Sequence, residues 1–355
     1  MSGGVDSSVA AALLKRRGYE VIGLTMDIFD IPKEFCREES LSSCCGQGAK
    51  ADAIRVAAHL DISHYMIDLK KSFRDTVIAD FCEEYKKGRT PNPCIRCNRF
   101  IKFDALWRKT KSLGADFLAT GHHARITQDE KSGRYLLSKG RDAEKDQSYY
   151  LYTLTQEQLA RTIMPIGDFT KKDVRKMAQQ FTLSVDQRPE SQEICFIPDN
   201  DYIRFLKQLN PEAFRPGPII DAESRVLGRH KGVLHFTIGQ RKGLGIAAPH
   251  PLYVLEIHAG EDKIIVGTND QLYKKGVNVS HVNLIGTGKL ISPLSVQAKI
   301  RYKHREAKAI LTPLKKDRVR LDFKKPQRAV TPGQSAVFYD GDVVIGGGII
   351  ESARD

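Results

Sequence analysis

The first residues of the chain form a motif suited to binding phosphate. Residues 2–8 read Ser-Gly-Gly-Val-Asp-Ser-Ser and open a segment with helical periodicity. Two glycines let the backbone approach phosphate oxygens closely, and the amides at a helix N-terminus point toward an anion. The motif has no P-loop lysine, and Asp6 would repel phosphate unless a magnesium ion or a loop amide holds its carboxylate. A helix with a Gly-Gly turn and Ser/Asp caps explains the same residues.

Seven cysteines are the second set of side chains that could do chemistry. Their odd number in a chain of 355 residues argues against a disulfide framework and for thiols in a reducing compartment. Cys94 and Cys97 form a CxxC on a turn before a helix, flanked by Arg96 and Arg99. Helix N-termini and nearby cations favour the nucleophilic thiolate. Cys195 lies far along the chain in a separate apolar segment.

Three interpretations of the cysteines compete. Buried structural thiols suit Cys82, which falls in a helix-like segment. A structural zinc site needs four ligands, and the CxxC with the pair Cys44 and Cys45 does not have the usual spacing of such a site. Sulfur transfer needs one thiol to carry a persulfide and another to resolve it, which fits two reactive cysteines far apart in sequence. Cys36, Cys44 and Cys45 lie in a polar, loop-like stretch and are assigned no role.

The positive charge is concentrated near the C-terminus. The chain has a formal net charge of +13 at pH 7, which favours an anionic partner. Residues 271–330 contain 15 Lys or Arg and 3 acidic residues. Residues 296–303 and 318–323 alternate with the period of a strand, which places Lys299, Arg301 and Lys303 on one face. We expect a small all-β domain that presents cations to a polyanion, since a merely solvated face normally mixes both signs.

The remaining sequence predicts the elements that position these groups. Alternating helical and extended segments predict an α/β fold with a doubly wound parallel sheet, whose ligands bind at the carboxyl ends of the strands. Helices are expected at residues 5–17, 50–60, 70–87, 94–113, 156–163 and 171–181, and strands at residues 21–26, 65–69 and 117–120, followed by a hairpin. A Pro-rich, linker-like stretch follows residue 201. The predicted domains are a catalytic domain at 1–204, a small central β-rich domain at 205–272 and a basic C-terminal β-barrel at 273–355.

Composition excludes several classes of protein. Hydrophobic residues make up 41% of the chain, which is typical of a globular protein and not of a disordered one. The longest apolar run falls far short of the roughly 20 residues that cross a bilayer. We therefore expect a cytoplasmic protein without a membrane segment.

Residues 2–8 resemble the SGGxDS motif of the PP-loop ATP pyrophosphatase superfamily, whose members split ATP between the α and β phosphates and adenylate a substrate. In that fold a hydrophobic strand of about five residues runs directly into the loop, and here that strand is missing before Met1. Either the start codon is placed late, or the sheet lacks a strand and ATP binding is impaired. The first explanation is favoured because the remaining chain looks intact.

Further motifs resemble the bacterial tRNA-specific 2-thiouridylase family and occur in the family's order. They are Asn-Pro-x-x-x-Cys-Asn at 92–98, Ala-Thr-Gly-His at 119–122, Lys-Asp-Gln-Ser-Tyr at 145–149, Ile-Cys-Phe-Ile at 194–197, Gly-Gln-Arg-Lys-Gly-Leu-Gly at 239–245 and Thr-Pro-Gly-Gln-Ser-Ala-Val at 331–337. The resemblance implies ATP-dependent 2-thiolation of the wobble uridine of tRNA.

The resemblance also implies roles for individual residues. Cys97 matches the family's catalytic nucleophile and Cys195 its cysteine persulfide, and Asp6 joins them as a catalytic residue. The implied nucleotide contacts are Ser2, Gly3, Gly4, Val5, Asp6, Ser7, Met26 and Gly121. The implied contacts with the target base are Asn92, Pro93 and Cys94. The implied tRNA contacts are His122, Lys145, Asp146, Gln147, Arg301, Tyr302 and Gln334.

Two groups of side chains leave alternatives open. A common form of the family has Asp at the position of Cys94, so Cys94, Cys97 and Cys195 could be three ligands of a 4Fe–4S cluster. Alternatively, Cys94 is a spectator or assists persulfide exchange. Three tyrosines could stack on bases, but at helical spacing they more often belong to the core; they are Tyr149, Tyr150 and Tyr152.

The resemblance implies ATP, Mg²⁺, the anticodon stem-loop of tRNA and a protein sulfur donor, either a sulfur-relay protein or a cysteine desulfurase, with the chain acting as a monomer. Two rival functions share part of the pattern. Another PP-loop adenylating enzyme, of the 4-thiouridine type or an amide-forming synthetase, would share the loop without needing Cys97 and Cys195. A non-catalytic RNA-binding protein would share the basic domain without needing the loop.

Overall fold

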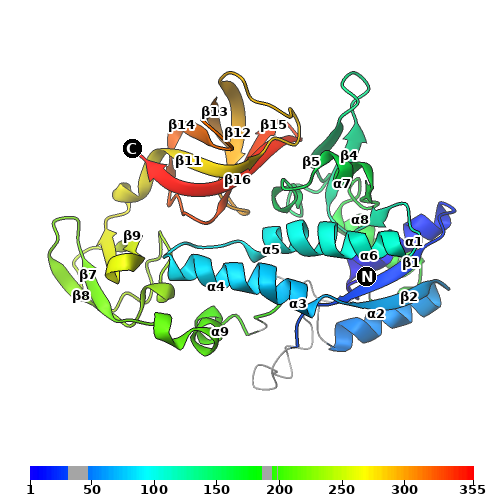
Figure 1. Ribbon diagram of the computed structural model, residues 1–355, viewed down its shortest axis with the longest axis horizontal. Coiled ribbons are helices and arrows are strands. Elements are labelled where there is room, and N and C mark those ends of the chain that lie inside the picture. The colour runs from blue at the N-terminus through cyan, green and yellow to red at the C-terminus, as the bar shows by residue number, and fades with distance from the viewer. Residues whose placement is uncertain (31–46, 186–193, 198) are drawn as a thin grey trace. The chain divides into compact units, whose positions relative to one another are not determined.

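The computed structural model describes residues 1–30, 47–185, 194–197 and 199–355, which form two units (Figure 1). The first unit comprises residues 1–78, 93–201 and 342–344, and the second comprises residues 79–92, 202–341 and 345–355. Cys36, Cys44 and Cys45, to which the sequence assigns no role, lie outside the described residues. No helix in the described ranges is long and apolar enough to cross a membrane.

The first unit begins with the alternating elements that the sequence predicts. They are α1 (Val5–Arg16), β1 (Ile22–Asp27), α2 (Gln47–His59) and β2 (Ser63–Asp68). β1 and β2 pair in parallel, and α2 packs along both strands (Figure 1). α1 packs on α8 (Lys171–Gln180) through an apolar core that includes Val5, Val9, Val56, Val174 and Ala178. This core holds the start of α1, and with it the glycine motif.

The two long predicted helices each consist of consecutive helical segments. α3 (Lys70–Phe73) continues as a π-helix (Arg74–Ile78) and then as α4 (Ala79–Lys86), whose residues belong to the second unit. α5 (Pro93–Arg96) likewise continues as a π-helix, η4 (Cys97–Ala105), and then as α6 (Leu106–Ser112). Proline at the first helical position has no hydrogen bond to lose, so the CxxC lies in the first turn of the helix and not on a preceding turn. π-helical segments are rare and often occur at functional sites.

Short strands complete the first unit. β3 (Leu118–Ala119) pairs in parallel with β6 (Thr162–Ile163), and β4 (Ala124–Gln128) and β5 (Tyr135–Lys139) form the predicted hairpin. The parallel pairing expected for this domain is therefore confirmed in two pairs, β1 with β2 and β3 with β6. The helix predicted at residues 156–163 is wrong at residues 161–163, because α7 (Gln156–Ala160) ends before β6. The β-branched side chains of Thr162 and Ile163 suit a strand better than a helix.

The second unit contains a helix where the sequence predicts a linker. α9 (Tyr202–Leu209) forms because its apolar residues recur at helical spacing and pack on α4. The ring of Tyr202 stacks on Tyr85 at 5.1 Å, and Phe205 meets Phe81 edge-on at 6.3 Å. A four-stranded sheet follows in the order β8 (Val226–His230), β7 (Gly217–Ile220), β10 (Lys263–Gly267) and β9 (Tyr253–His258).

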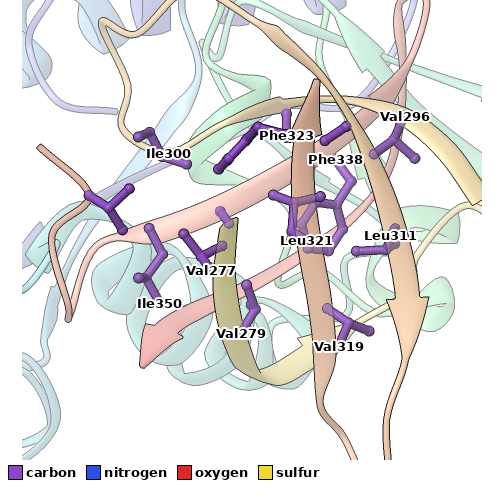
Figure 2. Packing of buried hydrophobic residues seen from close by; sticks show 14 of the residues in the cluster. Val277, Val279, Val296, Ile300, Leu311, Val319, Leu321, Phe323, Phe338 and Ile350 are labelled. Carbon is purple, nitrogen blue, oxygen red and sulfur yellow. The ribbon is translucent and has the colours of Figure 1, made fainter. Parts of the chain in front are cut away.

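Six strands of the C-terminal segment close into a barrel, as the sequence predicts. They are β11 (Tyr273–Asn283), β12 (Leu294–Lys299), β13 (Ala307–Pro313), β14 (Val319–Arg328), β15 (Ser335–Asp340) and β16 (Val343–Arg354), with β11 paired to β16. Figure 2 shows the apolar side chains of these strands meeting in the interior, among them Val277, Leu321 and Phe338. The alternation predicted at residues 318–323 is confirmed, since Val319, Leu321 and Phe323 are buried.

One prediction for this barrel is wrong. The strand expected at residues 296–303 ends at Lys299, and residues 301–304 form a turn in which His304 N donates to Arg301 O at 3.1 Å. Arg301 and Lys303 therefore lie in the turn and do not share a strand face with Lys299. Apolar and basic residues alternate through 303 in the sequence, but the side chains of a turn do not point to alternate faces as those of a strand do.

Candidate active site

The glycine motif forms a loop packed tightly on both sides at the start of α1. Gly3 has a φ of +67°, and a Cβ there would lie 2.1 Å from the carbonyl oxygen of Ala49 in α2. A Cβ at Gly121 would lie 2.6 Å from Ser7 N. The Ser7 hydroxyl donates to Gly4 O at 3.1 Å. Glycine is thus required at both positions by close backbone approach, and the loop is held between α2 and the segment at residue 121.

The N-terminus of α1 is arranged to receive an anion. Gly4 occupies the N-cap position in an extended conformation and brings no side-chain cap. Ser2 closes the loop, because its backbone N–H donates to Ser7 Oγ at 3.2 Å. The first amides of a helix need acceptors from outside the helix, and the helix dipole favours a negative charge there. These are the properties expected of a phosphate loop.

Asp6, in the first turn of α1, forms an ion pair that sequence reasoning missed. Lys171 Nζ lies 2.7 Å and 2.8 Å from the two carboxylate oxygens of Asp6. His123 Nε2 lies 3.5 Å from Asp6 Oδ1. Burial alone would raise the pKa of Asp6, but the nearby His123 ring and the Lys171 ammonium outweigh it and lower the pKa. Asp6 is therefore an anion at neutral pH.

The segment at residues 140–148 braces both partners of Asp6. Gln147 Oε1 accepts from His123 N at 2.9 Å, and Gln147 N donates to His123 O at 2.9 Å. Asp142 Oδ2 accepts from Lys171 N at 2.9 Å. Asp146 is 3% exposed, and its carboxylate accepts from the backbone of Gly140 and from Ser148. The structure thus gives Asp146 and Gln147, which the resemblance associates with tRNA, contacts that position the loop around Asp6.

His122 lies beside this segment as a buried ring. Its Nδ1 is 2.8 Å from Thr120 Oγ1, and its ring centroid is 5.9 Å from that of Phe103. Burial, reinforced by the charge of Lys102, lowers the pKa of His122 well below its ordinary value. The ring is therefore neutral. Lys145, another of the predicted tRNA contacts, is half-buried in the segment at residues 140–148.

The carboxyl end of β1 carries Met26, the predicted nucleotide contact, as a half-buried side chain. Asp27 follows it and pairs with Lys50 at 2.6 Å and with Lys70 at 3.3 Å. Burial would raise the pKa of Asp27, but its hydrogen bonds and charge interactions with these two lysines lower it. Ligands of parallel sheets bind at this end of the strands.

The described cysteines differ in their surroundings. Cys97 is buried at the start of η4, Cys94 is exposed, and Cys195 is half-buried. Burial raises the pKa of the Cys82 thiol in α4, which suits an inert structural role.

Apolar packing links the segment of Cys195 to the helix of Cys97. The ring of Phe196 meets that of Phe73 in α3 at 5.5 Å, and α3 packs against η4. Asn98 is 2% exposed, and its Nδ2 donates to Tyr150 O at 3.0 Å, which fixes η4 beside residues 148–152. Tyr149 and Tyr152 are buried, so the core interpretation is confirmed for both.

The three thiols proposed as cluster ligands do not fit a metal centre. Within residues 1–30, 47–185, 194–197 and 199–355, no three side chains of His, Cys, Asp or Glu are grouped so as to hold a metal ion. Cys94 is exposed while Cys97 is buried. Asp6 fits Mg²⁺ differently, because Mg²⁺ is commonly held by one or two carboxylates together with substrate phosphates.

The predicted tRNA residues of the second unit lie on or near the barrel. Arg301 Nη2 donates to Arg328 O at 3.1 Å, and the neighbouring Tyr302 is half-buried. Gln334 Nε2 lies 3.0 Å from Thr90 O and 3.2 Å from Pro91 O. Exposed cations of the segment 271–330 include Lys275, Lys289, Lys303, Arg305, Lys308, Lys315, Lys316, Arg318, Lys324 and Lys325.

Asn92 and Pro93 lead into the helix of the CxxC. Asn92 is half-buried and Pro93 is buried, while Cys94 presents an exposed thiol. The structure therefore brings the loop residues, Gly121 and Asp6 together, and it adds Lys171 and His123. A capping box, Thr170 with Asp173, marks the helix start next to Lys171, but no sequence signal pairs that lysine with Asp6.

Comparisons with known proteins agree over nearly the whole chain. Residues 1–199 match the tRNA methyl transferase HUP domain, residues 203–268 the tRNA methyl transferase PRC-barrel domain, and residues 274–350 the aminomethyltransferase beta-barrel domain. A tRNA-specific 2-thiouridylase MnmA from Halothermothrix orenii is 50% identical over 351 residues, 99% of this chain and 97% of the relative. The tRNA-specific 2-thiouridylase MnmA from Acetivibrio thermocellus is 50% identical over 352 residues, 99% of this chain and 98% of the relative. Among solved structures, the U34-tRNA thiolase NcsA from Methanococcus maripaludis with its 4Fe–4S cluster aligns with a TM-score of 0.33 and 20% identity, over 59% of this chain and 65% of that chain.

Proposed function

The chain belongs to the family of tRNA-specific 2-thiouridylases, and we propose from this that it catalyses ATP-dependent 2-thiolation of the wobble uridine of tRNA. The observation that carries the proposal is the glycine loop with Asp6, packed between α2 and Gly121 in the same unit as Cys97 and Cys195. An RNA-binding protein without catalysis would have no use for that loop.

Activation of the base comes first, because the oxygen on carbon 2 of uracil is not a leaving group. ATP lies with its phosphates on the loop of residues 2–7, near Met26 and Gly121. The oxygen on carbon 2 attacks the α-phosphate, and pyrophosphate leaves. Asp6 would hold Mg²⁺ jointly with phosphate oxygens, and the ion, when bound, neutralises phosphate charge. The loop residues keep the α-phosphorus in line with the attacking oxygen.

Sulfur transfer follows at the two cysteines. Cys195 carries a persulfide, whose terminal sulfur attacks carbon 2 directly or after Cys97 releases it as hydrosulfide. The carbon–oxygen bond breaks and AMP leaves. The Cys97 thiolate forms a disulfide with Cys195 as the sulfur–sulfur bond of the persulfide breaks, and an external dithiol then reduces that disulfide. No iron–sulfur cluster enters the proposal.

The tRNA contacts divide between base and backbone. An unpaired wobble base leaves the anticodon loop at low cost, and residues 92–94 meet it next to Cys97. His122, Lys145, Asp146, Gln147, Arg301, Tyr302 and Gln334 remain the proposed tRNA contacts. We assign catalysis to residues 1–204, a connecting role to residues 205–272 and the positioning of tRNA to the basic barrel at 273–355.

The proposed cellular setting follows from the same chemistry. A protein donor, a sulfur-relay protein or a cysteine desulfurase, loads Cys195. The chain acts as a monomer in the cytoplasm, where a reducing environment keeps its thiols available.

Nucleoside analysis of tRNA tests the proposal. The chain is expressed in cells that lack their own 2-thiouridylase, with Cys195→Ser and the buried Cys82→Ala as matched variants. We expect 2-thiouridine to return with the original chain and with Cys82→Ala, and to be absent with Cys195→Ser while tRNA binding is nearly unchanged. Retained 2-thiouridine with Cys195→Ser would remove that residue from the mechanism. Formation of 4-thiouridine instead would indicate the rival PP-loop activity.

A further inference from the structure

The nucleotide site contains an ammonium group that its sequence motif lacks. Lys171 is the first residue of α8, its side chain is 12% exposed, and its Nζ contacts both carboxylate oxygens of Asp6. Asp6 is itself part of the glycine motif and sits in the first turn of α1. The ammonium group of Lys171 therefore contacts a residue of the loop that is proposed to hold the phosphates of ATP.

The position of Lys171 is determined by three separate features. A capping box between Thr170 and Asp173 starts α8 at this lysine. The backbone N–H of Lys171 donates to Asp142 Oδ2 at 2.9 Å. α8 packs on α1 through side chains of the shared apolar core, including Val174. The backbone at Lys171 is consequently anchored, while its four-carbon side chain keeps rotatable bonds.

His123 provides an independent sign that this site accepts a ligand. The ring is 2% exposed, and neither of its nitrogens has a hydrogen-bond partner in the part of the chain that the structure describes. Its backbone is fixed on both sides by Gln147. Nε2 lies 3.5 Å from Asp6 Oδ1, an ion-pair contact longer than an ordinary hydrogen bond. Buried polar groups are nearly always satisfied, so this ring retains hydrogen-bonding capacity for a group that arrives with a ligand.

The carboxylate of Asp6 would then have two competing partners, Lys171 and Mg²⁺. A carboxylate that turns toward Mg²⁺ on a bound nucleotide would give up its contacts with Lys171 Nζ. Moving a mostly buried ammonium away from a carboxylate is unfavourable unless another anion takes its place, and phosphates bound on the loop next to Asp6 would supply that anion.

We propose that Lys171 is the phosphate-binding cation of this site, and that it exchanges Asp6 for the β and γ phosphates when the nucleotide binds. This inference rests on the proposed function, because it takes ATP as the nucleotide. Before binding, the Asp6–Lys171 pair keeps both side chains in place. After binding, the phosphates hold Lys171, and Asp6 becomes available to the metal.

Nucleotide affinity measured by calorimetry on the full chain tests the exchange. Lys171→Met should weaken binding of a non-hydrolysable ATP analogue by about 10- to 100-fold, the range for a lost hydrogen bond to a charged group. AMP, which lacks the β and γ phosphates, should bind within about threefold of the original affinity. The neighbouring exposed Lys172→Met is the matched control and should change neither affinity. Unchanged analogue binding by a folded Lys171→Met chain would overturn the proposal.

A second variant separates phosphate binding from mere support of Asp6. In buffer with a chelator and no magnesium, Asp6→Asn should bind the ATP analogue as tightly as the original chain or more tightly, because Lys171 no longer pairs with a carboxylate at residue 6. If the lysine served only to hold Asp6, Asp6→Asn and Lys171→Met would weaken binding alike, and the proposal would fail. Lys171→Arg, which keeps the charge, should recover part of the affinity.

The test also distinguishes this inference from the proposed function. A chain that binds the ATP analogue through Lys171 but forms no 2-thiouridine would leave the inference standing and remove the function. A chain that forms 2-thiouridine, and whose Lys171→Met variant binds the analogue normally, would do the reverse.

Discussion

Two regions of the molecule pair cations with carboxylates at similar distances, yet they are built for different tasks. In the first unit, Lys171 meets Asp6 at 2.7 Å beside a glycine loop. In the second unit, Arg89 Nε meets Glu84 at 2.6 Å, and its Nη1 meets Glu351 at 3.3 Å. The distances alone would describe both as ion pairs of ordinary geometry.

The contacts of Arg89 indicate that it has a structural role. Its Nη2 donates to Ile350 O at 3.5 Å, and the second partner, Glu351, also accepts from the Ser280 hydroxyl. Thr90 and Pro91, which follow Arg89, form hydrogen bonds with residues of the barrel segment through their backbone, and these bonds hold the chain just before Asn92. Thr90 N donates to Pro332 O at 2.9 Å, and Gln334 Nε2 lies within 3.2 Å of the carbonyls of Thr90 and Pro91.

The difference lies in what surrounds each pair. Around Arg89 the partners are other parts of the same unit, and no ligand is needed to complete them. Around Asp6 the neighbours are an uncapped helix start, two glycines and a buried His123 ring without a hydrogen-bond partner among the described residues. An ion pair is therefore a sign of a binding site when its surroundings are incomplete, and a sign of structural support when they are complete.

The sharpest way to break this comparison is to fill the space beside the glycine loop. Gly3→Ala places a Cβ 2.1 Å from Ala49 O, so the loop must move, and we expect affinity for the ATP analogue to fall by about 100-fold or more. Gly133 has the same φ of +67° but has nothing within 4 Å of its Cβ. Gly133→Ala should therefore lower the free energy of unfolding by about 1 kcal/mol and leave nucleotide affinity unchanged. Equal loss of affinity in both variants would show that backbone strain, and not the crowded loop, is responsible.

The next test separates support from binding at the second ion pair. Arg89→Met removes the closer of two cations from Glu84, whose side chain is 16% exposed, and leaves Lys87 at 3.5 Å. Because Glu351 also loses its contact with Arg89, we expect the free energy of unfolding to fall by about 2 kcal/mol. Affinity for the ATP analogue should not change. The control is Arg225→Met, since Arg225 is 73% exposed and pairs with Asp221 at 2.6 Å, which predicts a smaller loss than for Arg89→Met. Urea unfolding and calorimetry give the two readouts, and weakened nucleotide binding by Arg89→Met would contradict the distinction between the regions.

The sequence predicts the elements of these regions better than their contacts. The helices predicted at residues 5–17 and 171–181 agree with α1 and α8 to within one residue at each end, because helical periodicity is a local signal. The barrel strand at residues 319–323 follows from strict alternation. These predictions succeed because periodicity acts within a few residues of the chain.

Contacts between distant residues could not be predicted in the same way. Lys171 and Asp6 are 165 positions apart, and they meet only because α1 and α8 share an apolar core. The roles implied for Asp146 and Gln147 could not reveal that their side chains brace the loop around Asp6. Local patterns were misleading at two places. The prolines after residue 209 suggest a linker, but Phe205 is buried and residues 202–209 form α9. The alternation at residues 296–303 suggests a longer strand, but β12 ends before the turn at Arg301.

The smallest expected effect concerns pH at Glu351. Burial would raise the pKa of its carboxyl, but the hydrogen bond from Ser280 and the charge of Arg89 lower it below the ordinary value of 4.5. A lowered pKa in the folded state means that the stabilisation is fully present above pH 4.5 and is lost as the pH falls through the folded pKa. The melting temperature of the full chain should therefore fall less steeply for Glu351→Gln than for the original chain between about pH 6 and pH 3.5. The exposed Glu212→Gln should follow the original curve, and a Glu351→Gln curve parallel to it would mean that the pair with Arg89 contributes no pH-dependent stability.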